Sequence, residues 1–275
     1  MNRLLTRIFI SLMTLGLIVS SPVHAKQLKY LDQPFPDIKQ NWRADDYELA
    51  LDSLVTIQKS QPDLLPKRRG EFTGPVYDRF ISEDNFRFQL DIKEPVEMRR
   101  EEAVRVSIAL KEMMRTYFDF KAKKQVYGSE ALGIMSYSLR QQAIFFTLSV
   151  EYWLSLPQEE TKQPQRLGEL EEHKRGAASL LSSAFKYLAL TGYFDREDLE
   201  VYGWELAHIT PELFVHLPLA KQQSIALQVE NLKDDHESHQ VVEAMTKLHP
   251  NLLELISQHQ KVLEAQKNTD SASVN

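Results

Sequence analysis

The stretch AIFFTLSVEYWLSL, residues 143–156, constrains the fold of this chain more than any other feature. Placed on a helix at 100° per residue, its apolar side chains point in nearly every direction instead of forming one stripe. A helix that is hydrophobic on all sides is stable only where other helices surround it. We therefore predict an all-α fold, a multi-helix bundle or array, with a central apolar helix near residues 130–156.

Amphipathic helical patterns lie on both sides of this segment. A three-four spacing of apolar residues predicts a helix over about Asp45–Ser60 and a long helix from Pro95 to about Tyr127. Similar stripes continue after the central segment. Nine glycines in 275 residues leave few positions that tolerate positive φ, which argues against a barrel, a sandwich or a Gly-rich phosphate loop.

One segment breaks the helical period. In NFRFQLDI, residues 85–92, apolar and polar residues alternate, and a period of two is typical of a strand. The sequence offers no evident partner strand, and an isolated strand would leave its backbone groups unpaired. We predict at most one short extended or β segment in this region.

The N-terminus has the three-part layout of a secretory signal peptide. Arg3 and Arg7 make a basic start, residues 8–19 are almost wholly apolar, and a short segment then ends at Ala25. The chain has no cysteine, so an exported form would be stabilised without disulfides. We predict a signal peptide over residues 1–25 and a bacterial protein that is periplasmic or secreted.

The remaining length allows one large domain. We predict a single all-helical domain over residues 26–267, with a possible subdivision in the polar linker near 157–168. Residues 268–275 are small and polar at the very end of the chain, which predicts a disordered tail.

The charge balance excludes two kinds of partner. The formal net charge of −6 becomes −8 once Arg3 and Arg7 leave with the signal peptide. An acidic protein gains neither counterion release from nucleic acid nor attraction to anionic lipid. No later apolar run is long enough to span a bilayer. We therefore expect no nucleic-acid partner and no stable membrane insertion after cleavage.

The stretch DDHESHQ, residues 234–240, allows two interpretations. Apolar stripes on its two sides would face opposite ways on one continuous helix, which predicts a break near Asp234, with Asp234 and Glu237 as a capping box. Alternatively, His236 and His239 can share a helix face and bind a metal ion. Their spacing differs from that of the H-E-x-x-H motif, whose histidines are four residues apart.

A wider metal hypothesis adds His208, which follows Glu205 with the Glu-x-x-His spacing of di-iron bundles. Those bundles need two such units, and the sequence has one. The metal hypothesis therefore predicts that His208, His236 and His239 converge in space with a carboxylate. The sequence itself predicts no cofactor.

The loop LPKRRGEFTGP is the remaining candidate site. Lys67, Arg68 and Arg69 precede a helix expected to start near Thr73 or Pro75, and cations beside a helix N-terminus can bind an anion. The other interpretation is a solvated loop whose charges balance an acidic surface. If these three residues rim a pocket, a small anionic ligand becomes the favoured hypothesis.

The sequence contains no complete catalytic motif. Ser183 and Lys186 have the spacing of penicillin-recognising serine enzymes, but the S-D-N and K-T-G elements of those enzymes do not occur. Our leading hypothesis is a non-enzymatic binding or interaction protein of the periplasm, whose partner is a protein or a small anionic ligand. The alternative is a helical metal-binding protein or enzyme that uses His and Glu residues of the C-terminal half.

Overall fold

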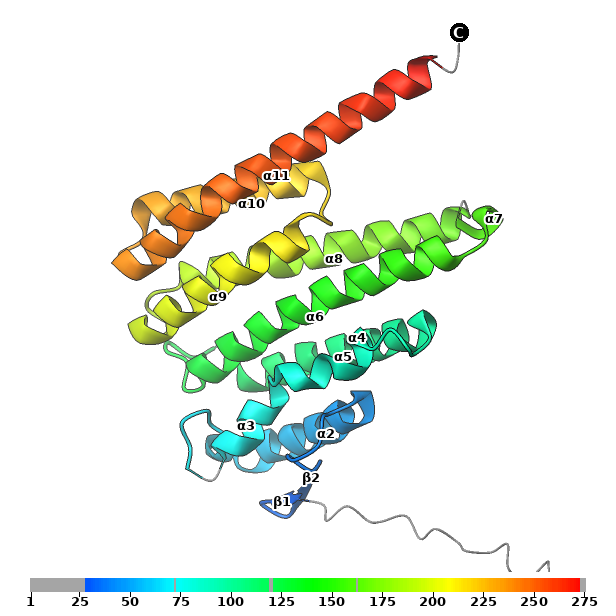
Figure 1. Ribbon diagram of the computed structural model, residues 1–275. Coiled ribbons are helices and arrows are strands. Elements are labelled where there is room, and N and C mark those ends of the chain that lie inside the picture. The colour runs from blue at the N-terminus through cyan, green and yellow to red at the C-terminus, as the bar shows by residue number, and fades with distance from the viewer. Residues whose placement is uncertain (1–27, 72, 119–120, 162, 273–275) are drawn as a thin grey trace, which may run out of the picture.

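The computed structural model describes residues 28–71, 73–118, 121–161 and 163–272. Within these residues the protein is an all-α array with one small antiparallel hairpin, which confirms the predicted fold class (Figure 1). In chain order the elements are β1 Leu28–Tyr30, β2 Gln33–Phe35, α2 Ala44–Ser60, the 3₁₀ helix η1 Pro62–Leu64, α3 Gly74–Phe80, the 3₁₀ helix η2 Glu83–Phe86, α4 Arg87–Leu90, α5 Val96–Tyr117, α6 Gly128–Ser155, α7 Gln158–Thr161, α8 Pro164–Leu188, α9 Arg196–Phe214, α10 Leu219–Asp235 and α11 His239–Ala272.

The sequence predicted a signal peptide at the N-terminus and a disordered tail at the C-terminus. The predicted signal peptide, residues 1–25, lies outside the described residues, and the predicted domain bounds stay a prediction. At the other end α11 is helical to Ala272, well into the segment 268–275 that was predicted to be a disordered tail. No helix in the described ranges combines the length and hydrophobicity that a membrane span requires.

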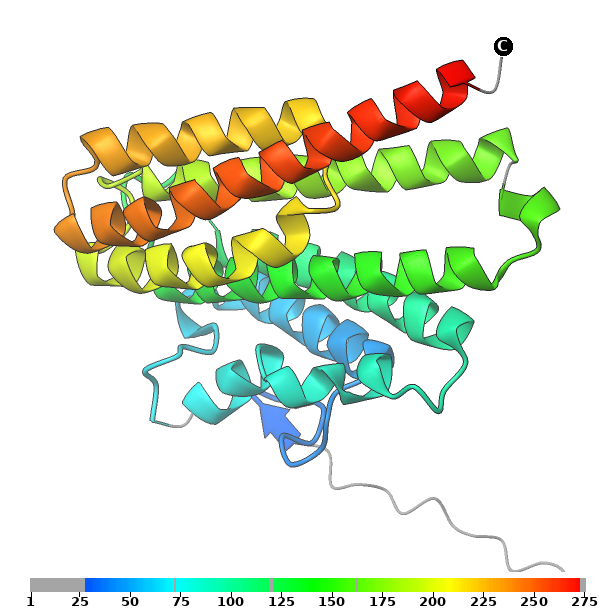
Figure 2. The same ribbon diagram turned by 45° about the horizontal axis from the view of Figure 1, so that its top comes forward.

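The helices pack in successive layers. α2 packs on α5, α5 on α6, α6 on α9, and α9 on α11, while α8 lies against α6, α9 and α10. Figure 1 shows this order from the β-hairpin and α2 at one end to α10 and α11 at the other, and Figure 2 shows the same layers with the top turned forward. Buried apolar side chains form one core that extends from Phe35 on β2 to Ile256 on α11.

α6 is the central helix that the sequence predicted. It packs against α5, α8 and α9, and every residue from 131 to 139 is buried. The half of α6 that is apolar on all sides is less covered, since the side chain of Leu154 is 78% exposed. α6 has 28 residues against 22 in α5 and 19 in α9, so its last turns extend past these two neighbours.

The predicted extended segment over residues 85–92 is wrong. This region forms η2 and α4, and its buried residues, Asn85, Phe86 and Gln89, follow helical spacing. Leu90 and Ile92, which produced the alternation in the sequence, are mainly exposed. Gln89 is buried instead because its amide pairs with that of Gln141 on α6. The alternation of apolar and polar residues was therefore misleading, because polarity at Gln89 does not indicate exposure when its amide is hydrogen-bonded inside the protein.

The helix that follows Pro95 is shorter than predicted. α5 ends at Tyr117 rather than near Tyr127, because Phe118 turns to extended backbone. The Phe118 ring packs against Tyr187 and Phe194. Burial of this aromatic ring on α8 and the turn before α9 outweighs continuation of the helix.

Candidate functional site

A pocket of about 410 Å³ opens where the loop that carries Arg68 and Arg69 meets α3, the first turns of α6 and one face of α9. We name it the Arg68 pocket, and its functional side chains are Arg68, Arg69, Asp78, Asp198, Tyr202 and Glu205. Two arginines thus meet three carboxylates and a phenol. A volume of this size suits a small molecule rather than a polymer.

The loop that carries the two arginines is anchored at several points. The backbone N–H of Arg68 donates to the carboxylate of Glu130 on α6 over 2.7 Å. The N–H of Lys67 donates to the Thr73 hydroxyl over 3.0 Å, and the Tyr117 hydroxyl donates to the carbonyl of Pro66 over 3.0 Å. These bonds hold the loop backbone, so the arginine side chains extend from a defined frame.

The floor of the pocket depends on a glycine. The Tyr77 hydroxyl donates to the carbonyl of Glu130 over 2.8 Å, and it lies where Gly133 leaves space. A Cβ atom at position 133 would come within 2.4 Å of this hydroxyl oxygen. Gly133 is therefore required for the close contact between α3 and α6 at the base of the pocket.

One face of α9 supplies the acidic wall. Asp198, Val201, Tyr202 and Glu205 follow the three-four spacing of a single helix face, and all four line the pocket. Asp198 and Glu205 are two turns apart, which places them about 10 Å apart along the helix axis. The third carboxylate, Asp78, comes from α3.

The charges of the pocket are poorly compensated within the protein. Among the described residues no carboxylate lies within ion-pair distance of the Arg68 guanidinium, and no cation lies within that distance of Asp78 or Glu205. Arg69 makes loose contacts, 3.5 Å to Glu197 and 4.0 Å to Asp198. Exposed pairs of this kind contribute little to stability.

Asp198 is a largely shielded acid of this wall, with a side chain that is 15% exposed. Burial raises its pKa, and the negative charges of Asp195 and Glu197 raise it further. Arg69 and a hydrogen bond from Ser129 act in the opposite direction without overcoming the effect of burial. A cation arriving in the pocket would therefore stabilise the ionised Asp198.

The structure places two of the three predicted basic residues at this pocket. Arg68 and Arg69 line it, whereas the Lys67 ammonium lies 5.1 Å from the centre of the Tyr127 ring and is not part of the lining. The expected helix N-terminus contributes no free donors, because the amides of Gly74, Val76 and Tyr77 all donate to carbonyls of the loop. The guanidinium groups alone are available for an anion.

The sequence interpretation missed the acids. Glu205 was considered only as half of a metal motif with His208. The spacing of the acids with Val201 and Tyr202 was the available signal, but acids on an exposed helix face are common and do not identify a pocket. The packing of α9 on α6 brings these acids to the pocket that the arginines line.

The histidine stretch has a structural role. α10 ends at Asp235 and α11 begins at His239, so the predicted helix break is confirmed. The predicted capping box is wrong, since Asp234 lies inside α10 and the carbonyl of Ser238 accepts the N–H of Val242 at the start of α11.

Both ring nitrogens of His236 are engaged. Nδ1 accepts the N–H of Ser238 over 3.0 Å, and Nε2 lies 3.0 Å from the carbonyl of Leu188. A carbonyl only accepts, so Nε2 carries the proton and donates. No lone pair of this ring is left for a metal ion, and the ring ties the α10–α11 turn to the end of α8.

The other two predicted metal ligands do not join His236. His208 on α9 and His239 on α11 are both exposed. Within the described ranges no group of three or more His, Asp or Glu side chains is arranged to hold a metal ion. The convergence that the metal hypothesis requires is therefore not found in this part of the chain.

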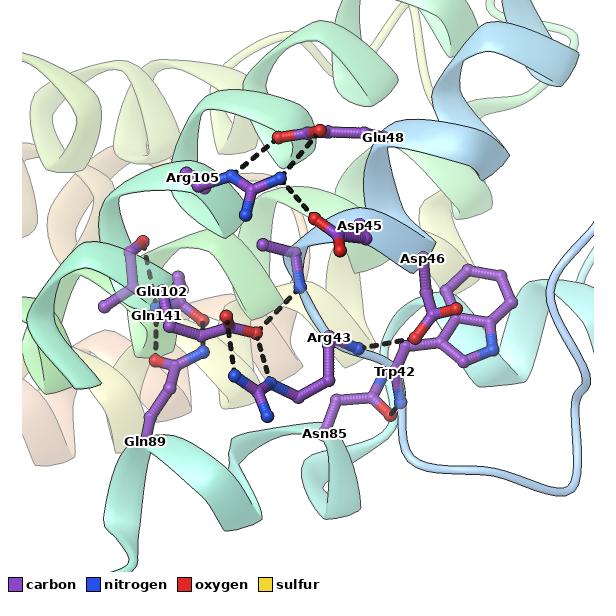
Figure 3. Close-up of polar contacts among 12 residues, drawn as sticks. Trp42, Arg43, Asp45, Asp46, Glu48, Asn85, Gln89, Glu102, Arg105 and Gln141 are labelled. Atoms are coloured by element: carbon purple, nitrogen blue, oxygen red, sulfur yellow. Dashed lines mark hydrogen bonds and ion pairs between the residues drawn. The ribbon is translucent and has the colours of Figure 1, made fainter. Parts of the chain in front are cut away.

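A second polar cluster lies between α2 and α5, and Figure 3 shows it in detail. The carboxylate of Glu102 accepts from Nε and Nη2 of Arg43, over 2.8 and 3.1 Å, and from the backbone N–H of Ala44 over 2.7 Å. The N–H of Arg43 donates to Asp46 over 2.9 Å. This group, the Glu102 clamp, holds the first turn of α2 on α5.

A larger groove of about 630 Å³ lies between α5, α6 and α8. Met114, Met135 and Leu180 make its floor partly apolar, and charged groups such as Lys111 and Glu172 lie at exposed positions. The charged side chains of this groove do not converge on one place as those of the Arg68 pocket do. We therefore take the Arg68 pocket as the candidate site.

Comparison with known proteins gives no match, whether with protein-family models, with curated protein sequences or with solved structures.

Proposed function

We propose that the protein is an exported, non-catalytic binding protein that holds a small anionic ligand in the Arg68 pocket. The observation that carries this proposal is that Arg68 lines the pocket while its guanidinium has no carboxylate within ion-pair distance among the described residues. The acidic, cysteine-free composition and the expected signal peptide agree with a periplasmic or secreted location.

The chemistry of arginine favours this assignment. A guanidinium presents a planar fork of donors that matches a carboxylate or phosphate group in two parallel hydrogen bonds. The anchored loop fixes the backbone from which this side chain extends, so binding orders the side chain without also having to order the loop. A charge-assisted contact of this type contributes about 1.5–3 kcal/mol, or roughly tenfold to a hundredfold in affinity.

Thermal shift and calorimetric titration with phosphate, citrate and glutarate test the proposal. We expect at least one of these anions to raise the melting temperature in a saturable way. Arg68→Gln should weaken that binding at least tenfold. Lys67→Gln is the matched control, because Lys67 is the neighbouring loop cation but lies outside the pocket. Equal loss in both variants, or no effect of Arg68→Gln, would contradict the proposal.

The expected export has its own measurement. Native mass spectrometry of the protein from the periplasm of the expressing cell should give a chain that starts at Lys26. The same spectrum reports any retained small molecule. A chain that still carries residues 1–25, recovered from the cytoplasm, would overturn the exported location.

A further inference from the structure

We infer that the ligand of the Arg68 pocket is a zwitterion, a small molecule whose anionic group meets Arg68 and Arg69 and whose ammonium group meets one acid of α9, Glu205 or Asp198. This inference rests on the proposed function and adds the chemical class of the ligand. It follows from the acidic wall, which a simple anion site does not need.

The two kinds of charge come from different sides of the pocket. The arginines extend from the loop, whereas the carboxylates come from α9 and α3. A ligand that lies between Arg68 and Glu205 therefore meets positive charge from the loop and negative charge from α9. A molecule with separated charges of both signs is complementary to this arrangement.

A pure anion fits the lining less well. Two guanidinium groups face three carboxylates, so the formal charge of the pocket is already negative before any ligand arrives. An anion bound at Arg68 would lie near carboxylates that have no cation of their own, and like charges repel. An ammonium group on the same molecule replaces this repulsion by attraction.

The acidic wall also has unused hydrogen-bonding capacity. Tyr202 lines the pocket between Asp198 and Glu205 and is 1% exposed. Its hydroxyl makes no hydrogen bond to the described residues. A buried hydroxyl without a partner is unfavourable, and a ligand or a ligand-bound water that reaches it would remove that cost.

Size and charge together narrow the ligand class. A pocket of about 410 Å³ accommodates a molecule of the size of a free amino acid or a dipeptide. The acids Asp198 and Glu205 are separated by about 10 Å along α9, so the ammonium can lie either close to the anionic group or several bonds away from it. The class is therefore small amino acids, including those with a terminal side-chain amine.

The test uses pairs of compounds that differ only by an amino group: L-glutamate with glutarate, and L-alanine with propionate. Calorimetric titration on the full mature chain should give at least tenfold tighter binding for the amino compound of at least one pair. Glu205→Gln or Asp198→Asn should reduce this preference at least fivefold by weakening the amino compound, while binding of the anion stays equal or tightens because a repelling charge is removed. Arg68→Gln should weaken both members of the pair.

Glu212→Gln is the matched control. Glu212 lies on α9 two turns beyond Glu205 and lines a different pocket, so its removal should change neither affinity. Circular dichroism and the melting temperature of each variant verify that it is folded.

The outcomes separate the two proposals. If the amino compounds and their partners bind equally, or the anions bind more tightly, the zwitterion inference is overturned and the anion-binding function stands. If no compound binds at 10 mM, both the anion-binding function and the zwitterion inference are overturned. This concentration is about 10⁴ times a micromolar Kd, so even weak binding would be detected. If the preference survives both Glu205→Gln and Asp198→Asn unchanged, the ammonium is recognised elsewhere and the assignment to α9 fails.

Discussion

The Glu102 clamp and the Arg68 pocket both bring arginines and carboxylates together, but they are built in opposite ways. In the clamp one carboxylate, 8% exposed at its side chain, receives three hydrogen bonds from Arg43 and Ala44. In the pocket Arg68, Asp78 and Glu205 line the same space without forming an ion pair with one another.

The difference teaches how structural and functional charges can be told apart. A buried charge that serves the fold is stabilised by close partners, because an unpaired one would cost several kcal/mol. Charges that converge on a pocket and remain unpaired are tolerated because water reaches them, and they stay free for a ligand. Substitutions in the clamp should therefore change stability, and substitutions in the pocket should change binding.

The largest expected effect is on the clamp. Glu102→Ala should lower the free energy of unfolding by about 3 kcal/mol, because it removes three hydrogen bonds and leaves the Arg43 guanidinium and the buried N–H of Ala44 without this partner. Urea denaturation measures this, with Glu101→Ala on the exposed side of α5 as the control. If Glu102→Ala lowers the free energy of unfolding by less than about 0.5 kcal/mol, the usual range of surface substitutions, the clamp does not stabilise the fold and does not differ from the pocket in this respect.

The neighbouring amide pair should give the next largest effect. Gln89 and Gln141 donate to each other over 3.1 and 2.7 Å and are almost fully buried. Gln141→Leu should cost about 2 kcal/mol, because it leaves the Gln89 amide unpaired. The double variant Gln89→Leu/Gln141→Leu should cost less than the sum of the single variants, and additive losses in a double-mutant cycle would contradict this pairing.

Substitution of Asp198 in the pocket should raise the free energy of unfolding, whereas the clamp substitutions lower it. The folded-state pKa of Asp198 is raised, so ionisation disfavours the folded state, and the destabilisation develops as the pH rises through that pKa. Asp198→Asn should therefore raise the free energy of unfolding by about 1 kcal/mol at pH 7 and leave it unchanged near pH 3, while it weakens zwitterion binding. Denaturation at the two pH values measures the effect, and a variant less stable than wild type at pH 7 would contradict the argument.

The smallest effect is expected at the exposed edge of the clamp region. Arg105 binds Glu48 through two bonds of 2.9 and 2.8 Å and also contacts Asp45 (Figure 3). These carboxylates raise the pKa of Arg105, so it remains charged. Because the site is exposed and screened, Arg105→Gln should cost about 0.5 kcal/mol at low salt. The difference should vanish in 1 M NaCl, and a loss that is independent of salt would indicate packing instead.

Much of the fold could be predicted from the sequence. The apolar run 143–156 and the flanking stripes gave the all-α class, and the helix over Asp45–Ser60 agrees with α2 to within one residue at its start. Opposed stripes around residue 234 gave the α10–α11 break. These features depend on local periodicity, which each segment carries independently of the rest of the chain.

The site could be predicted only in part. The cluster of basic residues in one loop was visible, and two of the three line the pocket. The acids that line the pocket from α9 could not be recognised as part of a site, and Glu205 was interpreted as half of a metal motif, because the role of an acid on a helix face depends on what packs near that face.

The sequence by itself determined the helical class, the central position of α6 and the charge balance, because these follow from composition and period. The tertiary structure decided which polar residues are buried and which charges meet. Gln89 is inside only because Gln141 pairs with it, and Arg68 faces Glu205 only because α3, α6 and α9 converge there. The physical reason is that a polar group is tolerated in a buried or shared position only when distant parts of the chain supply its partners, or leave that place to a ligand.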